Sequence, residues 1–205
     1  MIKKPLVEAQ NIFFEKAGRA ILSSVNMTLN EGDIVIVKGK NGSGKTSFLK
    51  CLAGFYRISK GQVLWSGEKI LPTCFPEKKM LAWLSHLNAV KLSLTVKENL
   101  LFYANLWSVK KNEYDYAIKY LCFSKYLELP VSWLSAGEKR RLCLARLMFC
   151  PSKVWLIDEP TTFLDEENKK IFERAMEEHA SKGGAIVCAS HDSLNINKFK
   201  TLSLD

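Results

Sequence analysis

The residues most able to do chemistry form a glycine-rich run that ends in lysine and threonine. The run reads Gly39, Lys40, Asn41, Gly42, Ser43, Gly44, Lys45 and Thr46, with Ser47 next. It fits the pattern G-x-x-x-x-G-K-[ST] without a gap, and its small residues let backbone N–H groups surround a polyphosphate. Lys45 is expected to reach the β- and γ-phosphates, and the Thr46 hydroxyl is expected to bind Mg²⁺. The run therefore predicts a site for ATP and Mg²⁺.

Two adjacent carboxylates form the second candidate group. Asp158 and Glu159 follow Val154–Ile157, an apolar run typical of a strand buried on both faces. Ligands of parallel sheets bind at the carboxyl ends of the strands, so Asp158 is placed to hold Mg²⁺ and Glu159 to act on water as general base. Taken alone, the pair is equally well explained as an acidic exit from a strand before Pro160. Beside the glycine-rich run, the catalytic interpretation is favoured.

Histidines supply a third candidate. His191 follows the apolar run Ala185–Ala189, where it is expected to face the γ-phosphate and stabilise developing charge. The alternative is a surface histidine that caps the start of a helix. His179 lies late in a predicted helix, where contact with the helix dipole is the simpler interpretation.

A capping box provides the fourth group. Ser135, Ala136, Gly137 and Glu138 place a serine at a helix start and a glutamate three residues later. The local interpretation is a helix that begins here and continues through basic and apolar residues to Phe149. The free N–H groups at such a helix start are also suited to binding an anion.

These groups need a sheet and its helices to position them. Alternating or continuous apolar runs predict strands, and turn residues and capping signals separate them from helices. The predicted strands are 5–14, 20–29, 34–37, 61–64, 68–71, 154–157 and 185–189, and the predicted helices are 46–53, 95–107, 113–121, 135–149 and 166–180. Strands that alternate with helices imply an α/β fold in which helices pack on a parallel sheet.

The composition fits one globular domain. The 205 residues are 47% hydrophobic and 25% charged, which argues against disordered and fibrous classes. A net charge of +9 favours anionic partners, but a basic solvated surface explains it equally well. The six cysteines form no C-x-x-C pair and predict buried thiols in a reducing compartment. No apolar run approaches the ~18 residues of a membrane span and no signal peptide is visible, so a soluble chain that needs a partner for any membrane role is expected.

The order of these motifs resembles that of the ABC ATPase family. Leu134–Glu138 is similar to the family's L-S-G-G-Q signature, Val154–Glu159 to its Walker B strand with the catalytic glutamate, Thr162–Asp165 to its D-loop, and His191 to its switch histidine. The resemblance implies a P-loop NTPase with a RecA-like parallel-sheet core, an N-terminal antiparallel β subdomain and an inserted helical subdomain. It also implies a single domain over residues 1–205, with the core at 1–87 and 151–205 and the helical subdomain at 88–150.

The resemblance further implies how two subunits meet. In the family, the signature of one subunit, here Ser135, Ala136, Gly137 and Glu138, covers the γ-phosphate bound by the other. A head-to-tail homodimer with two ATP molecules is therefore expected. In that dimer Glu159 would orient water, and Lys45 and His191 would stabilise the leaving charge. No nucleic acid partner is expected, since ABC proteins that act on nucleic acid usually carry two cassettes in one chain or long insertions.

Three positions depart from the family pattern. Lys16 stands where the family usually places an adenine-stacking aromatic, just after Phe13–Phe14, so weak selectivity for the base is expected. His86 replaces the Q-loop glutamine and is a candidate contact to Mg²⁺ or water, and its ionisation would make activity pH-sensitive. Glu138 and Ala136 replace a glutamine and a glycine of the signature.

Within that family, the chain resembles the ATP-binding subunits of bacterial cytochrome c maturation transporters, the CcmA group. The resemblance lies in Gly61–Gly67, Leu84–Asn88 and Leu94–Leu100. It implies a peripheral subunit on the cytoplasmic face of the bacterial inner membrane that serves haem handling. The implied partners are an integral membrane subunit (CcmB-like) and a CcmC-like protein nearby. Two alternatives stay open: the ATPase subunit of another small exporter, for a lipid or peptide, and a soluble ABC protein that acts on nucleic acid or the ribosome.

Overall fold

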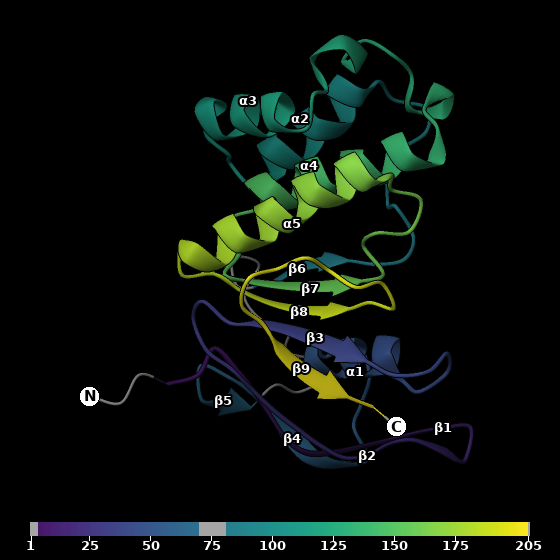
Figure 1. Cartoon of the computed structure of the whole chain (residues 1–205), viewed down its shortest axis with the longest axis vertical. Helices are drawn as coiled ribbons and strands as arrows, with labels where there is room; N and C mark the ends of the chain where they lie inside the picture. The colour runs from purple at the N-terminus through teal and green to yellow at the C-terminus, as the bar shows by residue number, and fades with distance from the viewer. Residues whose placement is uncertain (1–3, 70–80, 205) are drawn as a thin grey trace.

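The centre of the molecule is a five-stranded parallel sheet. In the computed structural model, which describes residues 4–69 and 81–204, every neighbouring pair in this sheet is parallel. The strands in spatial order are β6 (Leu81–Leu84), β7 (Val154–Asp158), β8 (Ala185–Ala189), β3 (Ile34–Lys38) and β9 (Lys200–Ser203). Their arrowheads point to the same edge of the molecule in Figure 1. This common direction gathers the segments that follow β3, β7 and β8 at one edge.

Both faces of the parallel sheet are buried. Along β3, Ile34 and Ile36 belong to one hydrophobic cluster, whereas Val35 and Val37 belong to another on the opposite face. This alternation follows from the two-residue period of side chains along a strand. A continuous run of β-branched residues is therefore what a strand covered on both faces requires.

The lower face of the parallel sheet packs against one helix and a second sheet. Helix α1 (Lys45–Leu52) lies between the parallel sheet and an antiparallel sheet at the other end of the molecule (Figure 1). The antiparallel strands, in spatial order, are β2 (Arg19–Leu29), β1 (Val7–Lys16), β4 (Lys60–Trp65) and β5 (Glu68–Lys69). The indole of Trp65 donates to the carbonyl oxygen of Leu52 at 3.0 Å, which joins this sheet to α1.

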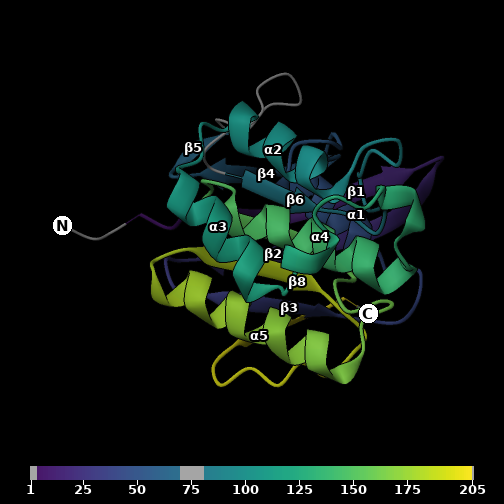
Figure 2. The same cartoon turned by 90° about the horizontal axis from the view of Figure 1, so that it is seen from above.

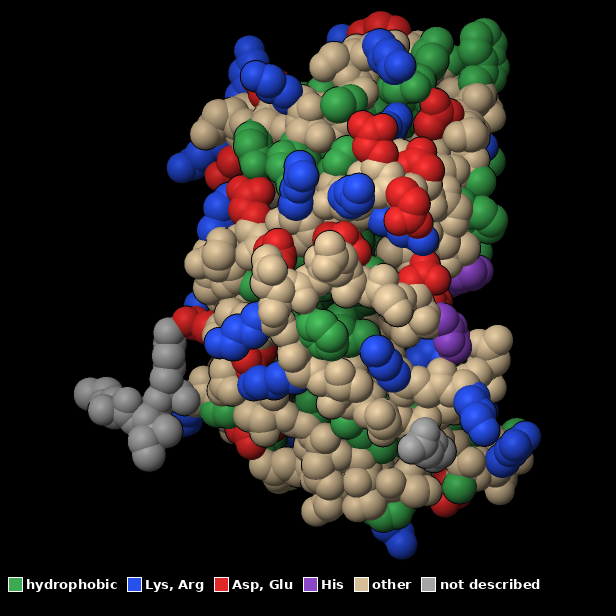
Figure 3. All heavy atoms as spheres, viewed as in Figure 1, with side chains coloured by type: hydrophobic (Ala, Val, Ile, Leu, Met, Phe, Trp, Pro, Cys, Tyr) green, Lys and Arg blue, Asp and Glu red, His purple; other side chains and the backbone are tan. Residues whose placement is uncertain are grey.

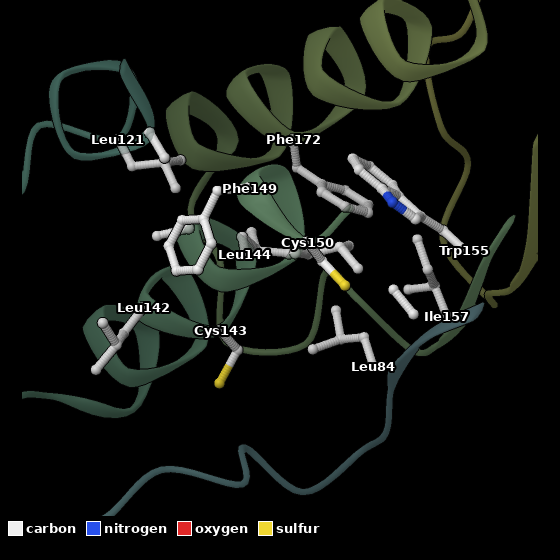
Figure 4. Packing of buried hydrophobic residues seen from close by; sticks show 14 of the residues in the cluster. Leu84, Leu121, Leu142, Cys143, Leu144, Phe149, Cys150, Trp155, Ile157 and Phe172 are labelled. Carbon is white, nitrogen blue, oxygen red and sulfur yellow. The ribbon is translucent and has the colours of Figure 1, made fainter. Parts of the chain in front are cut away.

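The upper face is covered by helices. They are α2 (Val96–Leu106), α3 (Lys111–Tyr120), α4 (Ala136–Phe149) and α5 (Glu166–Ser181), with short 3₁₀ turns at Ser124–Tyr126 and Val131–Trp133. Figure 2 shows them layered over the sheet, and Figure 4 shows Phe172 above Ile157, with Leu144 and Phe149 to the left in the same cluster. In the described residues, no helix is long and apolar enough to cross a membrane.

Most of the predicted elements are confirmed, within a few residues at their ends. Two strands were missed, β6 and β9, which are only four residues long each. A four-residue apolar run cannot be distinguished from helix or loop by its period, and β9 reads Lys-Thr-Leu-Ser. The predicted strand 68–71 ends at Lys69, and its remaining residues lie outside the described part of the chain.

The prediction of buried thiols is confirmed for four cysteines and wrong for one. Cys51, Cys143, Cys150 and Cys188 are buried, and burial raises the pKa of Cys51 to about 12 and that of Cys143 to about 11. Cys122 is exposed, because it follows the end of α3 in a turn with φ of 53°. Cys74 lies outside the described residues.

Candidate active site

A cavity of about 840 Å³ opens at the edge where β3, β7 and β8 end. The glycine-rich loop follows β3, Glu159 follows β7, and His191 follows β8. Side chains or backbone of Lys45, Thr46, Glu159 and His191 line this cavity together. In Figure 3, histidine side chains lie at this edge, with basic side chains below them. The volume lies within the range typical of small-molecule sites.

The glycine-rich loop depends on glycine at two positions. Gly39 has φ of 156°, and a Cβ there would overlap the carbonyl oxygen of Leu204. Gly44 has φ of 96°, and a Cβ there would lie 2.9 Å from Cδ2 of Leu22. Gly44 is also the N-cap of α1, and the first turn of that helix contains no acidic residue. The positive end of α1 therefore faces the cavity without a protein carboxylate in its first turn, as an anion site requires.

The Lys45 side chain is held by backbone carbonyl groups of the glycine-rich loop. Its ammonium donates to the carbonyl oxygens of Gly39 at 2.9 Å and Lys40 at 3.2 Å, and only 7% of the residue is exposed. It also lies 2.8 Å from Nε2 of His191. The same Nε2 lies 3.5 Å from a carboxylate oxygen of Glu159. Lys45 and His191, predicted independently, therefore meet at one point.

Thr46 and Asp158 are brought together from two different elements. The Thr46 hydroxyl lies 2.9 Å and 3.1 Å from the two carboxylate oxygens of Asp158, which is only 3% exposed. A hydroxyl and a carboxylate are the hard oxygen donors that suit Mg²⁺. The described residues contain no cluster of three or more His, Cys, Asp or Glu suited to a metal. This sparse set fits a Mg²⁺ ion that takes its other ligands from phosphates and water.

Glu159 adopts a strained backbone conformation at the end of β7. Its φ is 48°, which is uncommon for a residue with a side chain. Its N–H donates to the carbonyl oxygen of Ala189 at 2.9 Å, and its carboxylate accepts from the backbone N–H of His191 at 3.3 Å. Such strain persists only where the surroundings hold it, and it is typical of functional sites. Here it directs the carboxylate into the cavity.

The predicted signature residues are not among the described residues that line this cavity. Ser135 caps α4, its hydroxyl accepting from the N–H of Glu138 at 3.2 Å, and the carboxylate of Glu138 accepts from the N–H of Ser135 at 2.8 Å. This hydrogen bond also lowers the pKa of Glu138. Ser135 and Ala136 are exposed, and neither is among the described residues that line the cavity. The helix start predicted from the capping box is therefore confirmed, and it faces outward on its own chain.

Gly137 has a second, steric reason to be glycine. A Cβ there would lie 2.7 Å from the carbonyl oxygen of Phe163. The chain around Phe163 therefore lies directly against the first turn of α4. Phe163 itself is 66% exposed and lines the cavity, and sequence analysis placed it in the D-loop segment without a role of its own.

The departures at Lys16 and His86 have different outcomes. Lys16 lines the cavity beside Ile21, as its predicted register requires. Phe14 is buried and stacks on Tyr56 with ring centroids 5.0 Å apart, so it cannot substitute for an aromatic residue at that place. His86 is exposed, follows β6, and is not among the described residues that line the cavity.

The prediction of a dipole contact for His179 is wrong. Its ring stacks on Trp155 with centroids 3.9 Å apart, and Nε2 lies 3.2 Å from the carbonyl oxygen of Lys153. Burial lowers the pKa of His179 to about 4, so the ring is neutral near pH 7 and carries no charge for the dipole to bind. A Cβ on Gly184 would overlap the ring. His179 therefore fills the far edge of the sheet as an aromatic side chain.

Sequence analysis also missed Arg140. It was included in a basic run, yet only 2% of the residue is exposed and its guanidinium donates to the carbonyl oxygens of Asp158 at 3.0 Å and Glu159 at 2.7 Å. Its spacing from Leu144 and Leu147, four and seven residues later, would have placed it on the buried face of the helix.

Comparison with known proteins agrees with this geometry. Residues 22–162 match the model of the ABC transporter family. The chain is 35% identical to the cytochrome c biogenesis ATP-binding export protein CcmA of Paramagnetospirillum magneticum, over 96% of this chain and 93% of that protein. It is 32% identical to the CcmA protein of Haemophilus influenzae, over 100% and 97%, and 34% identical to ABC transporter I family member 1 of Arabidopsis thaliana, over 98% and 88%.

Solved structures share the fold. An ABC transporter ATP-binding protein from Pyrococcus furiosus superposes with a TM-score of 0.83 at 24% identity, over 97% of this chain and 96% of that one. The cbiO1 protein of Clostridium perfringens, part of the transporter complex cbiONQ, superposes with a TM-score of 0.76 at 22% identity, over 92% and 79%. The chain therefore belongs to the ABC transporter ATP-binding family, as a CcmA-like member that binds and hydrolyses ATP.

Proposed function

We propose that this chain is the ATP-hydrolysing subunit of a transporter that serves haem handling or export in c-type cytochrome biogenesis. The observation that carries this proposal is the similarity to CcmA proteins, which extends over nearly the whole length of both chains. Similarity confined to the phosphate loop and signature would point only to an ABC ATPase. Similarity over the full chain also includes the surfaces that differ between the ATP-binding subunits of different transporters.

In this proposal the cavity holds ATP with its phosphates at the glycine-rich loop. Lys45 exchanges the carbonyl oxygens of Gly39 and Lys40 for the β- and γ-phosphates, because a phosphate oxygen is the stronger acceptor. Thr46 and Asp158 would hold Mg²⁺, which would neutralise charge on the phosphates. The residues that contact ATP within this chain extend from Gly39 through Ser47.

Glu159 and His191 are assigned to the hydrolytic step. Glu159 orients the attacking water and accepts its proton as general base, from a side chain that is 22% exposed at the cavity. His191 lies beside both Lys45 and Glu159, which places it to donate to a γ-phosphate oxygen as charge develops there. In that step Nε2 must carry the proton that it donates. We retain His86 only as a contact through water, since it does not line the cavity.

A second copy of the chain completes the site. Ser135 and Ala136 are exposed at this helix start, and none of Ser135, Ala136, Gly137 and Glu138 is among the described residues that line the cavity of their own chain. The Ser135 hydroxyl, which accepts from Glu138, still has its own proton to donate, and a helix start is suited to a γ-phosphate bound elsewhere. In a head-to-tail homodimer with two ATP molecules, the helix start of each chain lies over the cavity of the other.

The membrane partner is assigned to an apolar surface beside the helical layer. We take residues 88–150 as an inserted helical subdomain and 1–87 with 151–205 as the core. The exposed apolar side chains at this junction are Leu87 (76%), Leu92 (52%), Phe102 (42%) and Leu106 (58%). Such a surface fits a CcmB-like integral membrane subunit, with a CcmC-like protein nearby, at the cytoplasmic face of the bacterial inner membrane.

Two measurements test the proposal. Glu159→Gln should lower ATP turnover by about 10²- to 10⁴-fold, the usual contribution of a general base, while ATP binding persists. Near-wild-type turnover would exclude Glu159 as the base. Expression of this chain in a bacterium that lacks its own CcmA should restore haem-stained c-type cytochromes, and Glu159→Gln should not. A chain that hydrolyses ATP and yet neither restores c-type cytochromes nor co-purifies with CcmB would favour a different exporter.

A further inference from the structure

Arg140 is a buried cation at the junction of the signature helix and the catalytic strand. It lies in the second turn of α4, and 2% of it is exposed. Its Nε donates to the carbonyl oxygen of Pro160 at 3.1 Å, and its Nη2 donates to those of Asp158 at 3.0 Å and Glu159 at 2.7 Å. The guanidinium therefore binds three successive carbonyl groups around the residue assigned as general base.

The other end of the same guanidinium holds a different segment. Nη1 donates to the carbonyl oxygen of Ser85 at 2.7 Å and to Oδ1 of Asn88 at 3.3 Å. These residues follow β6 and flank His86, in the stretch that leads to the apolar surface. One planar group thus joins the segment 85–89 to the end of β7.

A stripe of side chains on α4 continues this attachment. Cys143 donates from its thiol to the carbonyl oxygen of Asn88 at 2.7 Å, and Arg146 donates to that of Ala89 at 3.0 Å. Residues 140, 143 and 146 are spaced by three, so they lie along one side of the helix. Figure 4 shows the Cys143 thiol pointing from α4 toward the chain that continues from Leu84. The segment 85–89 is therefore attached along α4, and Arg140 alone of the three also contacts the catalytic strand.

The chemistry of Arg140 argues against a role in packing alone. Its five hydrogen bonds all go to carbonyl oxygens, and burial is the main cause that lowers the pKa of the guanidinium. Taking a cation out of water without pairing it to a hydrogen-bonded carboxylate is costly. A fixed fork with five donors is the group that can hold several carbonyl oxygens in one arrangement.

We propose that Arg140 is a positioning residue that couples both the segment 85–89 and the start of α4 to the backbone of Glu159. The inference rests on the proposed role of Glu159 as general base. A shift of the segment 85–89, or of the helix that begins at Ser135, moves the guanidinium, and the guanidinium moves the carbonyl groups on both sides of Glu159. The φ of 48° at Glu159 makes its side-chain direction sensitive to such a shift.

Hydrogen exchange followed by mass spectrometry tests the coupling without relying on activity. The full chain would be compared with Arg140→Lys, Arg146→Gln and Lys139→Gln. Arg140→Lys should accelerate exchange in both segments, 85–89 and 158–163, since a lysine cannot hold all five acceptors. Arg146→Gln should affect only 85–89. Lys139→Gln, a neighbouring change whose side chain makes one 3.4 Å contact to Ser132, should affect neither.

ATP hydrolysis by the same variants supplies the functional readout. Arg140→Lys should lower kcat by about 10²-fold through misplacement of the base, and the Kd for ATP should stay within about twofold of wild type. Exchange in 39–46 should also be unchanged. If Arg140→Lys is too unstable to purify, Arg140→Gln carries the same expectations. Failure of both variants to fold would assign Arg140 to stability alone and overturn the proposal.

The outcomes separate this inference from the assignment of the base. Accelerated exchange in 85–89 alone, or in neither segment, overturns the coupling even if Glu159→Gln is inactive. Normal turnover by Glu159→Gln overturns the base, and the exchange pattern would still show whether Arg140 joins the two segments. Unchanged kcat in Arg140→Lys, with exchange accelerated in both segments, would overturn its role in catalysis.

Discussion

Two helix starts in this molecule are built in opposite ways. Helix α1 has Gly44 as its N-cap, with no side-chain cap and no acidic residue in its first turn. Helix α4 has Ser135 as its N-cap and a complete capping box with Glu138. The first start faces a cavity formed within the chain, and the second is exposed. We therefore expect α1 to take its cap from a bound anion, whereas α4 is already capped within the chain.

This contrast also separates nucleotide binding, which one chain can do alone, from turnover, which we expect to need a second chain. The surroundings of α1 include Lys45, Thr46 and Asp158, which are already joined to one another or to the loop. Ser135, in contrast, is not among the described residues that line the cavity, so it does not meet Lys45 or Thr46 there. We therefore expect variants on the α1 side to lose nucleotide binding, and variants on the α4 side to lose only turnover.

The largest effect is expected for Lys45→Ala. The substitution removes the ammonium that lies between the loop carbonyls and His191. ATP binding by the isolated chain should weaken strongly, and turnover should fall by about 10³-fold or more. Equilibrium binding of a fluorescent ATP analogue and steady-state hydrolysis would measure the two effects. Retained binding would break the contrast on the α1 side.

Ser135→Arg should lower turnover by about 10²-fold and leave ATP binding by the isolated chain unchanged, because a bulky cation obstructs the partner rather than the cavity. Mixing this variant with Lys45→Ala gives the sharper measurement. In a head-to-tail pair, one site then combines an intact loop with an intact signature, so activity should reappear. A mixture as inactive as its two components would argue against a site shared between subunits.

Lys16→Tyr should have a smaller effect, at the base end of the cavity. An aromatic ring at the edge of the cavity adds stacking on adenine, so affinity for ATP should rise by between about twofold and tenfold. Affinity for a triphosphate without a base should not change. Isothermal titration with ATP and with tripolyphosphate would show whether the gain belongs to the base.

The substitution His179→Phe should have the smallest effect on ATP binding, because His179 contacts neither helix start. Its pKa is about 4 in the folded chain and ordinarily 6.5, so the unfolded chain binds the proton more tightly. The resulting stability is present above pH 6.5 and is lost as the pH falls toward 4. Urea unfolding of His179→Phe should therefore depend less on pH over this window than that of wild type. ATP binding at pH 7.5 should be the same in both.

Motifs confined to a few neighbouring residues were predictable from the sequence. The capping box at Ser135, and the helix after the glycine-rich loop, follow from local hydrogen bonds and spacing. The place of Asp158 and Glu159 at one edge follows from the shared direction of parallel strands. These inferences required no knowledge of distant contacts.

Features set by distant contacts were not predictable. Helical spacing could have placed Arg140 on the buried face of α4, but its partners are carbonyl groups 18 to 20 residues away and in the segment 85–89, and a run of three basic residues does not indicate them. The steric role of Gly137 depends on Phe163, and the stacking of His179 depends on Trp155. In each case a side chain is interpreted correctly only once its partner from another element is known.

The position of β3 has a consequence for how the protein is made. Its two neighbours are β8 and β9, which come from residues 185–203, and Gly39 packs against the carbonyl of Leu204. During synthesis, the early strand that carries the phosphate loop therefore waits with both edges unpaired while about 150 further residues are added. Its unpaired apolar surface is a liability for aggregation over that interval. A nascent chain should acquire nucleotide binding late and abruptly, when β8 and β9 emerge from the ribosome.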